Sequence, residues 1–349
     1  MKTLLASLPV ILGASLIHCT PTSLRPIRTP APRSPEHPFN ASIRPLVLWH
    51  GLGDSANSEG MQAFAQLVRD VHPGLFVHSI YLEHTEDADQ KAGWFGNIWE
   101  QLGIVSAQLS SIAELDDGFD AIGFSQGGQF LRAYVEKYNK PPVFNLITFG
   151  SQHMGVADLP VCRPGDLFCL LARSIARRGV YSTHAQTHLI QAQYFRDHAR
   201  LQLYYKQNKF LTSINGEVEE TRNETFKKNL LDLGNFVMIL FDQDTTVVPK
   251  ESSWFGSYVP PEDGDRKGPR WGEEVLPMRE QPLYKEDWIG LRKLDETGRV
   301  TMITCEGEHM HISRECYLPI VEQYVGKVME ADSINGGLVS SQGGLIIQH

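Results

Sequence analysis

The sequence predicts an α/β protein in which a mostly parallel sheet is flanked by helices and interrupted by a helical cap insertion. Short apolar or β-branched runs alternate with segments in which apolar residues recur every three or four positions. A G-x-S-x-G pentapeptide stands where one such run meets a helical segment. Residues 152–233 contain no convincing strand, which indicates an insertion between two strands of the sheet.

The expected strands are the near-continuous apolar runs at residues 46–49, 76–82, 120–124, 144–149, 236–241 and 300–304. Helical periodicity between them is carried first by Ile98, Leu102, Val105, Leu109 and Ile112, and then by Phe130, Leu131, Tyr134 and Val135. Because strands of a parallel sheet are buried on both faces, continuous apolar runs separated by helices favour a parallel sheet.

The chain ends differ in composition from the 45–328 region, which we interpret as one domain. Residues 1–20 resemble a secretory signal peptide, with Lys2 before an apolar run that is short for a membrane helix; an uncleaved anchor is the alternative. Residues 21–44 form a Pro-rich leader and 329–349 a flexible tail. No other stretch is apolar enough to span a membrane. Sequons at Asn40 and Asn223 predict glycosylation and support the secretory route.

Composition excludes several classes of protein. With 349 residues and a net charge of −9, the chain is ordinary for a globular protein, and the acidic balance argues against a nucleic-acid surface. No phosphate loop, zinc spacing or dinucleotide fingerprint is present, so we expect neither a cofactor nor a metal.

Five cysteines cannot all pair, but loss of Cys19 with the signal peptide would leave four. Cys162 and Cys169 lack a second pair nearby, which favours a local disulfide over a metal site.

The pentapeptide Gly123-Phe124-Ser125-Gln126-Gly127 follows an expected strand and begins an expected helix. A sharp turn in that position exposes the serine hydroxyl, and the flanking glycines leave room for the turn. The sequence therefore predicts that Ser125 is a nucleophile.

A serine nucleophile needs a base, and the base needs an orienting carboxylate, in the chain order Ser, Asp or Glu, His. Asp242 and Asp244 follow one late strand, and His309 and His311 follow the last. Spacing alone does not choose within either pair. Most of the 13 histidines are interpreted as solvated loop residues, among them His153, His184 and His188.

The negative charge that develops on the substrate carbonyl requires backbone N–H donors. One donor follows the nucleophile and is Gln126. The other is expected in the Gly-rich segment after the first strand, where the N–H of Leu52 is the candidate.

These segments resemble the palmitoyl-protein thioesterase family, in its lysosomal form. The similarity is carried by His50-Gly51-Leu52-Gly53-Asp54-Ser55, by Gly123-Phe124-Ser125-Gln126-Gly127-Gly128-Gln129-Phe130-Leu131-Arg132, and by Gly307-Glu308-His309. It implies an α/β-hydrolase fold and removal of long acyl groups, such as palmitoyl, from cysteine thioesters of lipidated proteins. Its expected partners are S-acylated proteins or peptides and long-chain acyl thioesters, and its expected location is the lysosome, the vacuole or the cell exterior.

The resemblance also assigns residues. It implies Ser125 as nucleophile, Asp244 as acid and His309 as base, and it places a cap disulfide at Cys162 and Cys169. Cys305 and Cys316 have no counterpart in the family, and a bond between them is a hypothesis. A secreted lipase or carboxylesterase acting on oxygen esters is the alternative enzyme. A non-catalytic lipid-binding protein would need a broken triad, and none is visible in the sequence.

Overall fold

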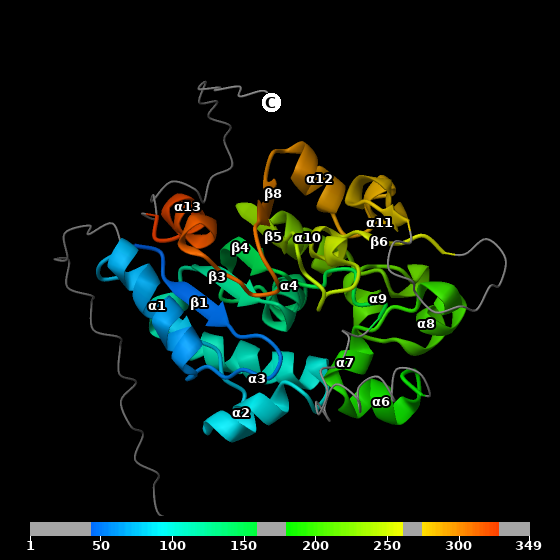
Figure 1. Ribbon diagram of the computed structural model, residues 1–349, viewed down its shortest axis with the longest axis horizontal. Coiled ribbons are helices and arrows are strands. Elements are labelled where there is room, and N and C mark those ends of the chain that lie inside the picture. Colours follow the sequence, from blue (N-terminus) through cyan, green and yellow to red (C-terminus); the bar gives the residue numbers. More distant parts are fainter. Residues whose placement is uncertain (1–42, 159–178, 261–273, 328–349) are drawn as a thin grey trace, which may run out of the picture. The chain divides into compact units, whose positions relative to one another are not determined.

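A parallel sheet forms the centre of the protein (Figure 1). The computed structural model describes residues 43–158, 179–260 and 274–327. Six strands lie in the order β2-β1-β3-β4-β5-β8, and every neighbouring pair is parallel. They are β1 (Leu46–Trp49), β2 (Val77–Ser79), β3 (Phe119–Phe124), β4 (Val143–Phe149), β5 (Asn235–Phe241) and β8 (Val300–Cys305). The predicted α/β class is confirmed, and the sheet is entirely parallel.

Five of the six expected strands agree with the structure to within one residue at each end, whereas the second is shorter. The apolar run at 76–82 contributes only β2, because the chain leaves the sheet after Ile80. The N–H of Leu82 donates to the Asp89 carboxylate at 2.7 Å instead of to a neighbouring strand. A side-chain acceptor from a following helix therefore ends this strand.

Helices cover both faces of the sheet. They are α1 (Glu59–Val71), α2 (Glu86–Ala92), α3 (Ile98–Ser110), α4 (Gln126–Lys137), α6 (Thr183–His188), α7 (Ile190–Gln193), α8 (Leu201–Gln207), α9 (Leu211–Ile214), α10 (Glu224–Leu231), α11 (Pro282–Lys285), α12 (Leu291–Glu296) and α13 (Arg314–Tyr324). Both predicted helical segments are present as α3 and α4. Ile112 lies beyond the end of α3 and introduces a short 3₁₀ turn.

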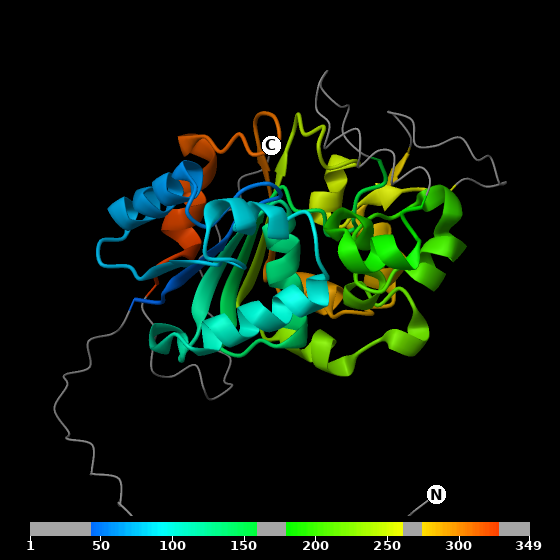
Figure 2. The same ribbon diagram turned by 90° about the horizontal axis from the view of Figure 1, so that it is seen from below.

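The core has two halves, one on each face of the sheet. Helices α1 and α13 pack on one face, and α3, α4 and α10 pack on the other (Figures 1 and 2). Alternate side chains of β1 enter the two halves, Leu46 and Leu48 on one side and Val47 and Trp49 on the other. All four are at most 2% exposed, as the strictly apolar run predicts.

The described part of residues 152–233 contains helices α6 to α10 and no strand longer than an isolated bridge. The later connection carries a two-stranded antiparallel sheet, β6 (Ser257–Tyr258) with β7 (Val275–Leu276), before α11 and α12. Across the described ranges, no helix combines the length and apolar character that a membrane crossing requires.

The topology brings four loops to one edge of the sheet. Because the strands are parallel, their carboxyl ends meet there, and ligands of open α/β sheets bind at that edge. The segments that follow β1, β3, β5 and β8 contain the Gly-rich segment, Ser125, Asp244 and His309, respectively.

Candidate active site

Ser125 stands between the last residue of β3 and the first residue of α4. Its backbone has φ 51° and ψ −119°, in a region that non-glycine residues rarely occupy. Its N–H donates to the carbonyl of Phe149 at 2.7 Å, which ties the turn to the end of β4. Backbone strain of this kind is found where the surrounding structure must hold a functional side chain in place.

The glycines around Ser125 are required by close backbone approaches. A Cβ atom on Gly123 would lie 2.3 Å from the Cα of Gly128. A Cβ on Gly127 would lie 2.4 Å from the carbonyl oxygens of both Trp49 and His50. Strand β3, helix α4 and the end of β1 therefore meet at distances that a side chain would prevent.

Three side chains from separate loops form a continuous chain of contacts. His309 Nε2 lies 3.0 Å from Ser125 Oγ, and His309 Nδ1 lies 2.6 Å from Asp244 Oδ2. The other oxygen of the buried Asp244 carboxylate accepts from the N–H groups of Thr246 (2.8 Å) and Val247 (3.0 Å). Both carboxylate oxygens are thus engaged, and one of them faces the imidazole.

Sequence spacing did not decide which of two carboxylates and which of two histidines belong to the triad. In the structure, the two members of each pair have different contacts. The Asp242 carboxylate accepts from the N–H of Gly307 at 2.8 Å and so joins the β5 and β8 loops. His311 packs against Gly307, where a Cβ would lie 2.3 Å from its ring. Asp244 and His309 are the pair in contact with one another.

A disulfide closes the loop that carries His309. Cys305 ends β8 and Cys316 lies in the first turn of α13, with their Cα atoms 5.4 Å apart. Gly150 packs on the opposite side of the loop, where an added Cβ would lie 3.2 Å from the His309 ring and 2.8 Å from Met310. The histidine loop is therefore anchored at both ends and supported from β4.

The Gly-rich segment after β1 lies directly beside Ser125. A Cβ added to Gly51 would be 3.4 Å from the Ser125 Cβ. Within the described ranges, no hydrogen bond occupies the backbone N–H of Leu52 or of Gln126. Unoccupied backbone donors next to a nucleophile are what an oxyanion site requires.

An acidic residue that the sequence did not single out holds this segment in place. The Asp89 carboxylate accepts from the N–H of Ala56 at 2.9 Å, and His50 Nε2 lies 3.4 Å from it. His50 in turn contacts the carbonyl of Gly51 through Nδ1 at 2.9 Å. Burial acts to raise the pKa of Asp89, but the contact with His50 and the hydrogen bonds from the N–H groups of Ala56 and Leu82 together hold it below its usual range. The carboxylate is therefore charged when it braces the segment.

The Gln126 side chain connects the nucleophile turn to two other segments. Its Nε2 donates to the carbonyl of Gly93 at 3.1 Å, and the hydroxyl of Tyr194 donates to its Oε1 at 3.1 Å. Gln191 Nε2 also donates to Gly93, at 3.2 Å. Burial raises the pKa of Tyr194, so its hydroxyl stays protonated as a donor. No sequence motif indicated these contacts.

The interpretation of His153 as a solvated loop residue is wrong. Its side chain is fully buried, its Nε2 lies 3.0 Å from Thr148 Oγ1, and its ring stacks on Phe255. Burial and the nearby Arg132 charge hold its pKa well below the usual range. His184 and His188 are exposed, as expected, but they lie on helix α6 rather than in a loop.

The modification sites are only partly within the described residues. Asn223 is exposed at the start of α10, where its Oδ1 accepts from the N–H groups of Thr225 and Phe226. These bonds do not use its side-chain nitrogen, the atom to which a glycan would be attached. Asn40, Cys162 and Cys169 lie outside the described residues. No group of three or more potential metal ligands occurs in the described ranges.

Comparison with known proteins identifies similar sequences over most of the chain. The profile of a family described as Palmitoyl protein thioesterase matches residues 45–309. Palmitoyl-protein thioesterase 1 of Caenorhabditis elegans is 39% identical over 282 residues, which cover 80% of this chain and 91% of that protein. Palmitoyl-protein thioesterase 3 of Dictyostelium discoideum is 30% identical over 273 residues, which cover 77% of this chain and 86% of that protein. The human protein named Lysosomal thioesterase PPT2 is 29% identical over 298 residues, which cover 82% of this chain and 90% of that protein.

Proposed function

Because the chain belongs to the palmitoyl protein thioesterase family, we propose that Ser125, His309 and Asp244 are its catalytic triad. The protein is a serine hydrolase with an α/β-hydrolase fold that removes palmitoyl groups from the cysteine thioesters of lipidated proteins. The observation that carries the proposed roles is the unbroken contact from Ser125 Oγ through both ring nitrogens of His309 to Asp244.

The first half of the reaction transfers the acyl group to the enzyme. His309 Nε2 takes the proton of Ser125 Oγ as this oxygen forms a bond to the thioester carbonyl carbon. Asp244 keeps the other proton of the imidazole on Nδ1 and stabilises the imidazolium. The N–H groups of Leu52 and Gln126 donate to the oxyanion of the tetrahedral intermediate. When the C–S bond breaks, the cysteine sulfur leaves with its electron pair and takes the proton from His309.

The second half releases the fatty acid. His309, now neutral, removes a proton from a water molecule that attacks the carbonyl carbon of the palmitoyl-Ser125 ester. The same two N–H groups stabilise the second oxyanion. The ester C–O bond then breaks, Ser125 Oγ regains its proton from His309, and palmitate leaves.

Residues 152–233 are proposed as a cap that shelters the acyl chain. Two contacts support this position, since the N–H of Gly96 donates to the carbonyl of His188 at 2.9 Å and Tyr194 bonds to Gln126. The described part of this region therefore contacts both the nucleophile turn, through Tyr194, and the segment before α3, through His188. Each buried methylene contributes about 0.8 kcal/mol, so a sheltered chain of palmitoyl length would favour long acyl groups. Cys162 and Cys169 are proposed as the disulfide of this cap.

The secretory pathway is the proposed location, with the lysosome, the vacuole or the cell exterior as the destination. Relatives named lysosomal thioesterases support it. Glycosylation at Asn40 and at the exposed Asn223 is proposed on the same grounds.

Paired model substrates test the function. We expect a higher kcat/KM on an S-palmitoyl peptide than on the matching O-palmitoyl serine peptide, and loss of both activities in Ser125→Ala. Equal or faster turnover of the oxygen ester would instead support the lipase or carboxylesterase alternative. A Ser125→Ala protein that retains wild-type turnover would refute the assignment of the nucleophile.

A further inference from the structure

We propose that the outer edge of β2 binds the polypeptide that flanks the acylated cysteine, as an added strand. The inference rests on the proposed function and names a docking site for its protein substrate. It begins with the position of β2, which is the end strand of the six-stranded sheet and, among the described residues, pairs only with β1. An end strand carries a row of backbone groups that can pair with another chain.

The backbone groups of Val77 and Ser79 point to that outer edge. Phe76 and Ile80 hydrogen-bond to β1, at 2.9 and 2.8 Å, and backbone groups alternate in direction along a strand. The carbonyl of Val77 has one long contact, 3.4 Å from the Arg69 guanidinium. In the part of the chain that the structure describes, the Val77 N–H and both backbone groups of Ser79 have no hydrogen-bond partner.

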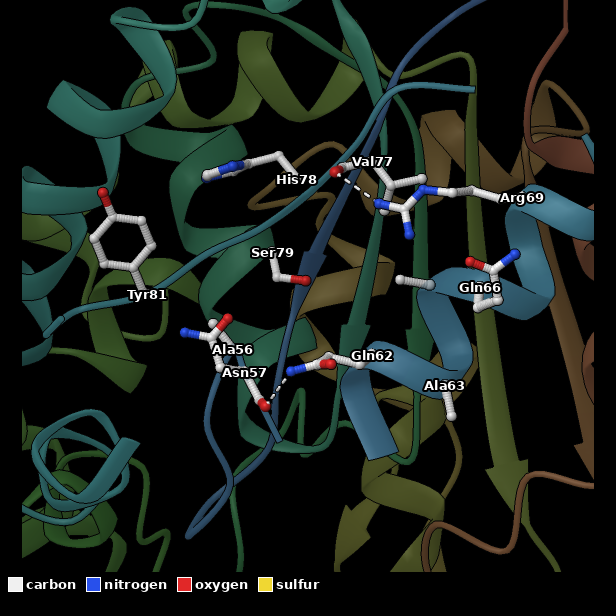
Figure 3. Close-up of a pocket in the computed structure, with 11 residues that line it drawn as sticks. Ala56, Asn57, Gln62, Ala63, Gln66, Arg69, Val77, His78, Ser79 and Tyr81 are labelled. Atoms are coloured by element: carbon white, nitrogen blue, oxygen red, sulfur yellow. Dashed lines mark hydrogen bonds between the residues drawn. The ribbon is translucent and has the colours of Figure 1, made fainter. Parts of the chain in front are cut away.

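A groove runs along this edge, between helix α1 and strand β2 (Figure 3). It has a volume of about 700 Å³. Gln62, Gln66 and Arg69 line it from α1, and Ser79 and Tyr81 line it from the β2 side. No Asp or Glu lines the groove, although the chain as a whole carries a charge of −9. A peptide carboxylate could therefore pair with the Arg69 guanidinium, while the Asp70 carboxylate accepts a hydrogen bond from Gln66 at 2.8 Å and is not itself part of the lining.

One end of the groove is next to the Gly-rich segment in the sequence. Ala56 and Asn57 line that end, and they directly follow the segment that contains Leu52. Strand β1 is the only strand between β2 and β3, the strand that carries Ser125 at its end. The added strand would lie three strand spacings from β3, or about 14 Å, a distance that about four to five extended residues span. A peptide paired with β2 could thus present a cysteine a few residues away to Ser125.

Strand addition suits a substrate defined by its acyl group. The added strand bonds through its backbone, so affinity does not depend on one particular side-chain sequence. Side chains of the peptide that face the groove would meet amides, two hydroxyls, an imidazole and one guanidinium, which adds a limited preference. The site therefore recognises an extended peptide with an acidic residue several positions away from the acylated cysteine.

Replacing one backbone donor tests the proposal. Ser79→Pro removes the outward N–H and no bond to β1, and proline is accepted at such edge positions. Ser79→Ala keeps the N–H and is the matched control. The substrates are an S-palmitoyl peptide with at least eight residues on each side of the cysteine, and S-palmitoyl-N-acetylcysteamine, which has no peptide. We expect Ser79→Pro to lower kcat/KM on the peptide by about 3- to 10-fold, mainly through KM, and to leave the small thioester unchanged.

A second variant guards against a local folding defect. Ala63→Trp places a bulky side chain in the groove from the exposed surface of α1, and Leu67→Trp adds the same bulk on α1 outside the groove. We expect Ala63→Trp to lower kcat/KM on the peptide but not on the small thioester, and we expect Leu67→Trp to change neither. Equal effects of Ser79→Pro and Ala63→Trp on both substrates, or no effect on either, would overturn the docking site. A wild-type protein that cleaves neither thioester would instead overturn the proposed function.

Discussion

Asp244→Asn is the change that most directly separates the two candidate carboxylates. The amide has the shape of the carboxylate, so the loop should keep its structure. Its oxygen can take over the bonds from the N–H groups of Thr246 and Val247, which leaves the NH₂ group facing His309 Nδ1. Since Nδ1 must then accept a hydrogen bond, the imidazole proton moves to Nε2. A protonated Nε2 cannot accept the proton of Ser125.

The expected loss follows from that change of tautomer. When a triad histidine is held in the wrong tautomer, kcat falls by about 10⁴, or about 5 kcal/mol of transition-state stabilisation. The assay is steady-state hydrolysis of an S-palmitoyl peptide, with urea denaturation to show that the fold is unchanged. Asp242→Asn is the control, because an amide oxygen can still accept from Gly307, and its kcat should stay within about threefold of wild type. An Asp244→Asn enzyme with more than a tenth of wild-type kcat would refute the assignment.

Three further predictions concern stability. Gly127→Ala would bring a Cβ to 2.4 Å from two carbonyl oxygens, so we expect the free energy of unfolding to fall by more than about 3 kcal/mol in urea titrations. The control is Gly60→Ala on the exposed part of α1, which should raise the free energy of unfolding by up to about 1 kcal/mol. The double change Cys305→Ser and Cys316→Ser opens an 11-residue separation and should cost about 2–3 kcal/mol, measured as a lower Tm; an unchanged Tm would show that the bond does not brace the histidine loop. Burial raises the pKa of Asp120 from 3.8 to about 7 despite Arg44 at 3.2 Å. Because this folded-state pKa is the higher one, the contribution of Asp120 is full below about pH 4 and is lost as the pH rises through 7. The free energy of unfolding of wild type should rise as the pH falls from 8 to 5, and Asp120→Asn should reduce that rise by about 2 kcal/mol. An equal rise in both proteins would contradict the raised pKa.

The sheet and the nucleophile turn could be predicted because local sequence determines them. Near-continuous apolar runs such as Leu46–Trp49 are buried on both faces, and glycines at 123 and 127 allow the close approaches that the turn needs. The end of β2 was misjudged because it depends on a side chain, that of Asp89, which takes the N–H of Leu82. An apolar run does not reveal where a distant acceptor ends it.

The site could be narrowed from sequence but not completed. Asp242 and Asp244 differ by two positions in one loop, and only the fold shows that one faces Gly307 and the other His309. The contacts Asp89–Ala56 and Gln126–Gly93 each join residues 33 positions apart, and neither has a motif. His153 was misplaced because its burial depends on packing against Phe255, a contact made only in the folded chain.

The central claim is that Ser125 forms the acyl-enzyme during thioester hydrolysis. Labelling with a serine-directed fluorophosphonate, followed by digestion and peptide mapping, tests it most directly. We predict a single label on the peptide that contains Ser125, protection by an S-palmitoyl peptide, and loss of thioester turnover in step with labelling. Labelling of a different residue, or thioester turnover that survives complete labelling of Ser125, would contradict the account.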